Sequence, residues 1–313
     1  MDGIDRLVLV TRATPLQEAV ARFATRDQAR FVMERSRVGS FSPLQSYEER
    51  FQAAREAILR AVPADVKVRE VDREFLPNYA FGSGDLVATL GPDGLVVNVA
   101  KYLAGQPIVA FNPDPSRIDG VLVPFVAEQA PTIFRRRAFR LRRLTMARVA
   151  LADGQELHAV NDLFIGQRTH VSARYRLSYA GSAEDQSSSG IVVSTGAGST
   201  GWYRSLVTGA AGLTDAEVPD YHWDAEAEEL RFTVREPFVS RASSAGLIHG
   251  RLTHGETLEI ASTMAQGGTI FSDGVEEDFL PFDSGATATV SVAERRVSLV
   301  VDEAPALSRP RRP

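Results

Sequence analysis

A glycine-flanked aspartate, Asp93 in GPDGL (residues 91–95), is the first residue in this sequence with a setting suited to chemistry. The motif follows a strand-length apolar run and precedes a helical pattern, so Gly91 and Gly94 would let the backbone approach a ligand closely. The unpaired N–H groups of a helix N-terminus favour a phosphate. Because a phosphate would repel a carboxylate placed directly on it, Asp93 is expected to face a hydroxyl or a metal ion. The alternative is that Asp93 only caps the helix that begins near Gly94.

A second candidate, SGIVVSTGAGSTGW (residues 189–202), joins an apolar run to small hydroxyl residues and glycines. Backbone amides and hydroxyls in its turn can wrap an oxygen-rich ligand, and the ring of Trp202 offers a face for a nucleobase. A flexible Gly/Ser linker is the alternative. The residues expected to contact the ligand are Thr195, Ser199, Thr200, Gly201 and Trp202.

Other polar residues are weaker candidates. Asn161 and Asp162 interrupt the apolar segment AVNDLFIG and place an amide beside a carboxylate. Such a pair can bind two ribose hydroxyls, although it is also common in turns. Arg117 suits a phosphate, and an exposed loop arginine explains it equally well. The five histidines show no pair at the spacing of a helical zinc site, so no metal ligand is assigned.

Composition limits the class of protein. The chain has 313 residues, of which 44% are hydrophobic and 24% charged, enough for one large or two ordinary domains. A net charge of −5 removes a general attraction to nucleic acid, and the absence of cysteine excludes disulfides and thiolate chemistry. No apolar run is long enough to span a bilayer. We therefore expect a cytoplasmic protein without nucleic-acid or membrane partners.

The elements that would position these residues change in type along the chain. Strand-length runs alternate with helical patterns in the first third, which predicts a doubly wound, parallel α/β domain of Rossmann or flavodoxin type over residues 1–120. In such sheets ligands bind at the carboxyl ends of strands, where the turn 91–94 lies. The expected strands are 6–11, 66–72, 85–91 and 106–113, and the expected helices are 15–36 and 47–62.

A mainly β-sandwich domain is expected over residues 121–305, because short apolar runs there are separated by Gly, Asp and Pro. Residues 306–313 are expected to form a flexible tail. The arginine-rich stretch 134–143 is expected to be a solvated face, with a phosphate site as the alternative, and the acidic stretch 273–283 a solvated hairpin, with a cation site as the alternative. The expected strands are 143–152, 155–166, 173–181, 189–196, 229–237, 256–263, 268–274, 286–293 and 296–303.

Taken together and in this order, the motifs resemble those of the ATP-dependent NAD kinase family. That family carries a Gly-Gly-Asp-Gly-Thr turn, an Asn-Glu pair, a segment ending in Gly-Ser-Thr-Ala-Tyr and a late Asp-Gly. The matching stretches here are GPDGL, the ND of AVNDLFIG, SGIVVSTGAGSTGW and the FSDG of residues 271–274. The resemblance runs from about residue 85 to about residue 300.

The resemblance implies a role for each matching residue. Asp93 matches the acid that activates the adenosine ribose 2′-hydroxyl of NAD, and Asn161 and Asp162 match the pair that holds the dinucleotide. The other matching positions are Gly91 and Gly94 in the phosphate turn, Asn112 after the next strand, Thr195 and Ser199 in the third motif, Thr200, Gly201 and Trp202 at the base pocket, and the late Asp273.

The implied activity is transfer of a phosphoryl group from ATP or polyphosphate to NAD(H), with Mg²⁺ or another divalent cation, to form NADP(H). The implied assembly is a homo-oligomer built through the β domain. Three residues depart from the family pattern: Pro92 replaces a glycine, Leu95 a threonine and Ser189 an aspartate. They leave two alternatives, a dinucleotide-binding or sensing protein without turnover and a kinase of this scaffold for a sugar or lipid hydroxyl.

Overall fold

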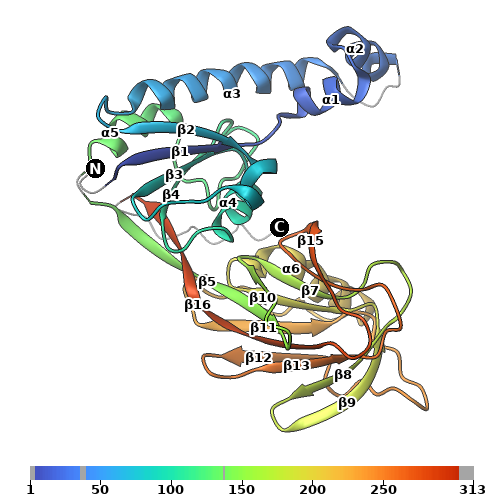
Figure 1. The fold of residues 1–313 in the computed structure, drawn as a ribbon. Coiled ribbons are helices and arrows are strands. Elements are labelled where there is room, and N and C mark those ends of the chain that lie inside the picture. Colours follow the sequence, from blue (N-terminus) through green and yellow to red (C-terminus); the bar gives the residue numbers. More distant parts are fainter. Residues whose placement is uncertain (1–3, 36–39, 137, 303–313) are drawn as a thin grey trace. The chain divides into compact units, whose positions relative to one another are not determined.

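The computed structural model describes residues 4–35, 40–136 and 138–302 (Figure 1). The chain divides into two compact units, Met1–Arg142 with Ser298–Pro313, and Arg143–Val297. Each unit is described by itself below. The expected boundary between two domains at residue 120 stays a prediction. The expected tail, 306–313, lies outside the described residues.

The first unit is built on a parallel sheet. Its strand order is β2-β1-β3-β4, followed by the last residues of β16, of which Ser298 and Leu299 pair with β4. This order is that of a flavodoxin-type doubly wound sheet, so the expected class is confirmed. The strands are β1 (Arg6–Thr11), β2 (Lys67–Asp72), β3 (Asp85–Leu90) and β4 (Pro107–Phe111).

Helices cover both faces of this sheet (Figure 1). Phe51 and Ile58 of α3 (Ser42–Ala61) pack with α5 (Ala130–Phe134) on the face that carries Leu7, Leu9 and Leu86. The apolar helix α4 (Asp93–Ala100) belongs to the opposite face and buries six of its eight residues. These two layers hold the turn between β3 and α4 in place.

The prediction of a single helix over residues 15–36 is wrong, because this segment forms two helices. Ala24 takes a left-handed φ of 64° and separates α1 (Pro15–Phe23) from α2 (Arg26–Arg35), and the Thr25 hydroxyl then accepts the Gln28 amide. Phe31 of α2 is 59% exposed, so the apolar face of a single helix does not continue through this segment. Helix α3 begins five residues before the expected 47, because Pro43 suits a first helical turn.

The second unit is a β-sandwich, as expected. One sheet has the order β12-β11-β10-β7-β14-β15, and the other has the order β16-β13-β8-β9, with β5 paired to β16 and β6 paired to β5. Alternate residues of both sheets form one apolar core, including Leu163 and Ile165 of β7. The strands are β5 (Arg140–Leu151), β6 (Glu156–Ala159), β7 (Asp162–Gln167), β8 (Ala173–Tyr179), β9 (Ser182–Ser188), β10 (Ile191–Thr195), β11 (Glu229–Val234), β12 (His249–Thr253), β13 (Leu258–Ser262), β14 (Gly268–Ser272), β15 (Val275–Pro281) and β16 (Thr287–Val301).

The strands β9 and β12 were not expected, and two of the expected strands form one continuous strand. β9 has a polar sequence, yet all its residues pair with β8, and Phe238 and Ser244 donate their amides to its other edge. β12 was also missed. The runs 286–293 and 296–303 join in the continuous β16. The acidic stretch forms the β14–β15 hairpin, and Arg135, Arg140 and Arg143 are exposed as expected of a solvated face.

No helix among the described residues is both long and apolar enough to cross a lipid bilayer.

Candidate functional site

The glycine–aspartate turn lies in the first unit, where β3 ends. The Gly91 amide donates to the Phe111 carbonyl at 3.2 Å, which fixes the turn to the end of β4. Asp93 is the first residue of α4, and its carboxylate accepts the Leu122 amide at 2.5 Å. Pro92 is the residue before the helix, and no side chain of the described residues caps it. The helix-capping alternative for Asp93 is therefore wrong: its carboxylate binds a distant loop.

Gly94 is a glycine that the fold does not require. A Cβ atom built on it would meet no atom within 4 Å, and its φ lies outside the left-handed region. Gly91 differs, because a Cβ there would lie 2.9 Å from the Leu95 side chain. Neither a close neighbour nor a left-handed φ therefore accounts for glycine at position 94.

The two departures in this turn have a structural basis. Leu95, which the sequence resemblance matches to a threonine, is 1% exposed and packs against Gly91. Pro92 lacks an N–H group and thus removes one donor from the turn. The N–H groups of the first turn of α4 remain the donors for an anion.

Asn112 organises the loop that follows β4. Its Oδ1 accepts the Asp114 amide at 2.9 Å, and its Nδ2 donates to the Ile118 carbonyl at 3.0 Å. The buried side chain thus holds the loop closed across six residues. The structure assigns it this positioning contact, and a ligand contact for Asn112 stays a prediction.

A buried acid in the same loop was missed by sequence reasoning. Asp114 is 1% exposed and accepts bonds from Arg50 at 2.7 Å and from the Ser116 hydroxyl at 2.6 Å. Burial raises the pKa of Asp114, but these hydrogen bonds outweigh it and the net pKa is lowered. Arg117 lies 3.8 Å from the same carboxylate. Arg50 is 64 residues away in sequence, so no local pattern could reveal this pair.

In the second unit, Asp273 holds the Asn161–Asp162 pair. Its carboxylate accepts three consecutive backbone amides, those of Val160 at 3.0 Å, Asn161 at 2.7 Å and Asp162 at 3.2 Å. Its own amide donates to the Asp162 carbonyl at 2.9 Å. The three predicted residues therefore meet at the start of β7, although Asp273 lies more than 100 residues along the chain.

The turn after β10 packs on the same backbone. The Thr195 amide donates to the Asn161 carbonyl at 2.9 Å, and the Thr195 hydroxyl donates to the Val160 carbonyl. A Cβ atom on Gly198 would lie 2.3 Å from the Asn161 carbonyl oxygen, so only glycine fits there. We call Val160, Asn161, Asp162, Thr195, Gly198 and Asp273 the carboxylate hub.

The remaining residues of the third motif differ in exposure. Ser199 is buried, and its hydroxyl donates to the Gly196 carbonyl at 2.7 Å. Thr200 and Gly201 are exposed at the end of a short 3₁₀ turn (Gly198–Thr200). Ser199 is thus used within the turn, while Thr200 and Gly201 are accessible to a ligand.

Asp162 has an unusual electrostatic setting. The residue is half-buried, but its Oδ1 atom is buried and has no hydrogen-bond partner among the described residues. Burial and, less strongly, the charge of Asp273 raise the pKa of Asp162 to about 7, against a lowering by the Ser194 hydroxyl. Near neutral pH this carboxyl group can therefore either donate or accept a hydrogen bond, which suits a ligand hydroxyl.

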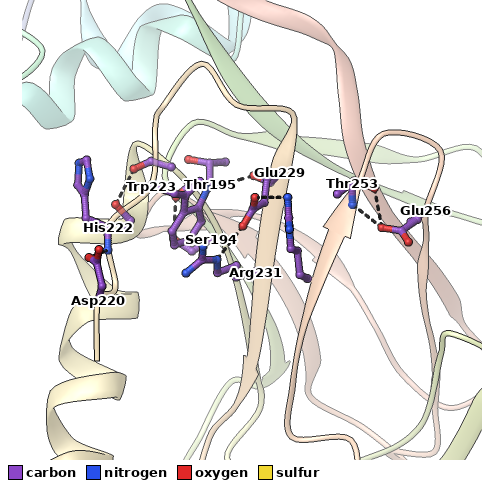
Figure 2. Close-up of polar contacts among 12 residues, drawn as sticks. Ser194, Thr195, Asp220, His222, Trp223, Glu229, Arg231, Thr253 and Glu256 are labelled. Atoms are coloured by element: carbon purple, nitrogen blue, oxygen red, sulfur yellow. Dashed lines mark hydrogen bonds and ion pairs between the residues drawn. The ribbon is translucent and has the colours of Figure 1, made fainter. Parts of the chain in front are cut away.

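Ser194 also places Asp162 in a row of polar residues. Asp162, Ser194 and Arg231 are direct cross-strand partners on β7, β10 and β11. Figure 2 shows Arg231 beside Ser194, donating to Glu229 at 2.8 Å. Its guanidinium also lies 4.3 Å from the centre of the Trp223 ring. The position of Arg231 is therefore set by Glu229 of the same strand and by Trp223 of the preceding loop.

Trp202 begins α6 (Trp202–Leu213) and belongs to an aromatic cluster. Its ring stacks on Phe164 with centres 5.6 Å apart, and Phe271 packs on Phe164 at 4.8 Å. Arg235 lies 5.2 Å from the Trp202 ring and 5.9 Å from the Phe164 ring, which places it beside the stack. A base can therefore stack only on the Trp202 face turned away from Phe164. Sequence reasoning missed Phe164 and Phe271, although both alternate with core residues.

No group of three or more His, Cys, Asp and Glu side chains within residues 4–35, 40–136 and 138–302 is arranged to hold a metal ion.

The fold described above is that of the NAD kinases, as the comparisons with solved structures show. The structure of yeast NADH kinase complexed with NADH is similar over 95% of this chain and 84% of that chain, with 17% identity and a TM-score of 0.58. An NAD kinase from Archaeoglobus fulgidus in complex with ATP is similar over 95% of this chain and 94% of that chain, with 16% identity and a TM-score of 0.56. The expected fold is therefore confirmed.

At the level of sequence, no family model matches this chain and no curated protein does.

The open space at Gly94 gives a first prediction. In Gly94→Ala, the free energy of unfolding should stay constant or rise by about 0.5–1 kcal/mol, because alanine favours a helix and meets no atom. ATP binding should weaken by about 1–3 kcal/mol if the new methyl group intrudes on a phosphate. Urea unfolding and calorimetry measure the two effects. Gly212→Ala in α6, also without neighbours, is the matched control, and unchanged ATP affinity in Gly94→Ala would reject a ligand at this glycine.

The raised pKa of Asp162 gives a second prediction. Because its folded-state pKa of about 7 exceeds the ordinary 3.8, the folded chain binds more protons than the unfolded chain between these values. The contribution of Asp162 to stability should thus fall as the pH rises through this range. The side-chain amide of the variant Asp162→Asn cannot ionise, so the wild type should lose stability relative to this variant between about pH 4 and 7 in urea unfolding. A pH-independent difference would contradict the raised pKa.

Proposed function

We propose that this protein is an NAD kinase-like phosphotransferase that transfers a phosphoryl group from ATP or polyphosphate to the 2′-hydroxyl of NAD(H). The observation that carries the proposal is the carboxylate hub, in which Asn161, Asp162, Thr195 and Asp273 converge from separate segments. The solved structures with the same fold contain NADH or ATP, which supports these ligand classes. A cytoplasmic location is part of the proposal.

In this proposal the first unit acts on the phosphoryl donor and on the proton. The amides of the first turn of α4, next to Gly94, hold phosphate oxygens. The ribose 2′-oxygen forms a bond to the transferred phosphorus while the bond from that phosphorus to the donor oxygen breaks. Asp93 accepts the proton that the 2′-hydroxyl loses in this step. Phosphoryl transfer depends mainly on positioning and electrostatics, so one acid and a phosphate turn are sufficient protein chemistry.

The second unit holds the dinucleotide. The buried Oδ1 of Asp162 lacks a partner among the described residues, and a ribose hydroxyl would supply one. Asn161 adds an amide beside it, while Asp273 only positions the pair through backbone amides. The open face of Trp202 takes the base. Activity assays of variants in each group of residues test the two roles separately.

Mg²⁺ is expected to arrive with the nucleotide. Magnesium is commonly bound through one or two carboxylates and substrate phosphates, and Asp93 is the carboxylate of the phosphate turn. When bound, the ion would neutralise negative charge on the transferred group.

A binding protein without turnover is the second candidate. The observation that favours it is the buried Leu95, which fills the place of a hydroxyl, together with the donor lost at Pro92. Tight dinucleotide binding without formation of NADP(H) would identify this function. Turnover with a sugar or lipid hydroxyl, and none with NAD(H), would identify a kinase for another acceptor.

Asp93→Asn tests the catalytic role. Asparagine keeps an oxygen that can accept the Leu122 amide, so the loop contact and the fold should survive. It lacks a basic oxygen, so NADP(H) formation from Mg-ATP or polyphosphate should fall by about 10²–10⁴-fold. Dinucleotide affinity should change little.

Asp119→Asn, at an exposed acid in the neighbouring loop, is the matched control and should retain full turnover. Turnover of Asp93→Asn within a few-fold of the wild type would end the proton-acceptor role.

A homo-oligomer also belongs to the proposal. Leu213, Phe238 and Val239 of the second unit are exposed by 90%, 63% and 67%, and an interface between copies would cover such apolar surface. Light scattering should return a multiple of 34.1 kDa. A mass of one chain at all concentrations would reject the assembly.

A further inference from the structure

Two glycines on neighbouring strands of the second unit make room for an aromatic ring. Ile165 of β7 pairs with Ile191 of β10, so the next residues, Gly166 and Gly190, lie side by side. Ile165 belongs to the sandwich core, so Phe164 and Gly166 share the opposite face of the sheet. A Cβ atom on either glycine would lie 2.7 Å from the Phe164 ring. The ring of Phe164 therefore lies over both glycines.

The Trp202 ring forms the next layer. Its centre is 5.6 Å from that of Phe164, and the two ring planes differ by only 14°. Phe164 is 5% exposed, whereas Trp202 is half-buried. The stack thus rises from the glycines through Phe164 to Trp202, and Trp202 is its outer ring.

Arg235 stands beside this stack, directly after β11. Its amide donates to the Gly190 carbonyl at 2.8 Å, and its carbonyl accepts the Ser189 amide at 2.9 Å, which fixes its backbone next to the glycine pair. The Cζ atom of its guanidinium is 5.9 Å from the centre of the Phe164 ring and 5.2 Å from that of Trp202. Because Trp202 is the nearer ring, the guanidinium reaches the level of the outer ring.

The Arg235 guanidinium has no acceptor within residues 4–35, 40–136 and 138–302. Its side chain contacts the two rings there and makes neither an ion pair nor a side-chain hydrogen bond. The two acids of its own segment are directed elsewhere: Glu229 accepts Arg231 at 2.8 Å, and Glu236 accepts the Ser189 hydroxyl. Arg235 is half-buried, so its donors are open to a ligand but only partly hydrated.

We propose that Arg235 binds a phosphate group of the nucleotide whose base stacks on Trp202. A planar guanidinium can donate two parallel hydrogen bonds to phosphate oxygens, and such charged bonds are about twice as strong as neutral ones. Stacking on Trp202 accepts any flat ring, whereas Arg235 beside it selects a phosphorylated nucleoside over an unphosphorylated one. This inference rests on the proposed function for the place of the base.

Two phosphates of the proposed reaction have this chemistry. One is the 5′-phosphate of the adenosine half, which NAD(H) already carries. The other is the 2′-phosphate, which the reaction adds. Contact with the first would make Arg235 a residue that binds substrate, and contact with the second would make it a residue that binds product.

Calorimetric titration of the full chain with adenosine, 5′-AMP and 2′-AMP tests the assignment. We expect the wild type to bind one of the two phosphorylated probes about tenfold or more tightly than adenosine, the scale of a charged hydrogen bond. In Arg235→Gln this gain should disappear, while adenosine affinity should stay the same. The probe that loses its gain identifies which phosphate Arg235 contacts.

Arg204→Gln is the matched control. Arg204 is an exposed arginine of α6 that also lies against an aromatic ring, 5.4 Å from the centre of Tyr221. This variant should leave all three affinities unchanged. Equal weakening of the phosphorylated probes in Arg204→Gln and Arg235→Gln would indicate a general attraction by positive charge and would overturn the contact.

Absence of a phosphate-dependent gain in the wild type would also overturn the proposal. If Arg235→Gln weakens adenosine as much as the nucleotides, Arg235 contacts the base and the phosphate contact is rejected. If circular dichroism shows that Arg235→Gln does not fold, Arg235→Lys decides. Lysine cannot donate two parallel bonds, so the gain should shrink, and an unchanged gain would reject the contact.

The titrations measure binding alone, so they separate this inference from the proposed activity. A wild type that forms no NADP(H) but shows the phosphate-dependent gain, lost in Arg235→Gln, would reject the kinase and support the contact. A wild type that forms NADP(H) and keeps the full gain in Arg235→Gln would do the reverse.

Discussion

One carboxylate receiving three consecutive backbone amides is the contact on which the candidate dinucleotide site depends. Asp273 pins residues 160–162 where β6 passes into β7, and the turn after β10 then packs on the carbonyls of the same residues. Because these bonds end on main-chain atoms, they define the path of the backbone rather than the identity of the side chains. Removing the carboxylate would leave three amides to find other partners, which is costly for buried groups.

The same contact divides the work between two neighbouring acids. Asp273 has its oxygens occupied by amides, whereas Asp162 keeps one buried oxygen without a partner among the described residues and a pKa raised to about 7. Asp273 is thus structural, whereas Asp162 can change its protonation near neutral pH and is the acid proposed to meet a ligand hydroxyl. In the first unit Asp93 combines both functions, since its carboxylate binds Leu122 and is also the proposed proton acceptor.

Sequence patterns predicted the strands of both units wherever apolar residues alternate or cluster, as in β1, β7 and β10. They failed where backbone pairing alone makes the structure: β9 is polar and is a strand because both its edges are paired. The order of the motifs identified Asp162 and Asp273 as candidates. It did not reveal that the Asp273 carboxylate positions the backbone of Asp162. Some contacts join segments that are distant in sequence, and local residue spacing does not predict them. Examples are the ion pair of Arg50 with Asp114 and the stacking of Phe164 on Trp202.

The path of β16 has a consequence for how the chain is made. Thr287–Val297 belong to the second unit, and the next residues complete the parallel sheet of the first unit beside β4. On the ribosome, the first unit therefore waits for the whole second unit to be synthesised before its last strand arrives. At about 5–20 residues per second, this delay is on the order of ten seconds. During that time the edge of β4 that the end of β16 later covers stays unpaired, and an exposed strand edge is a template for pairing with another chain.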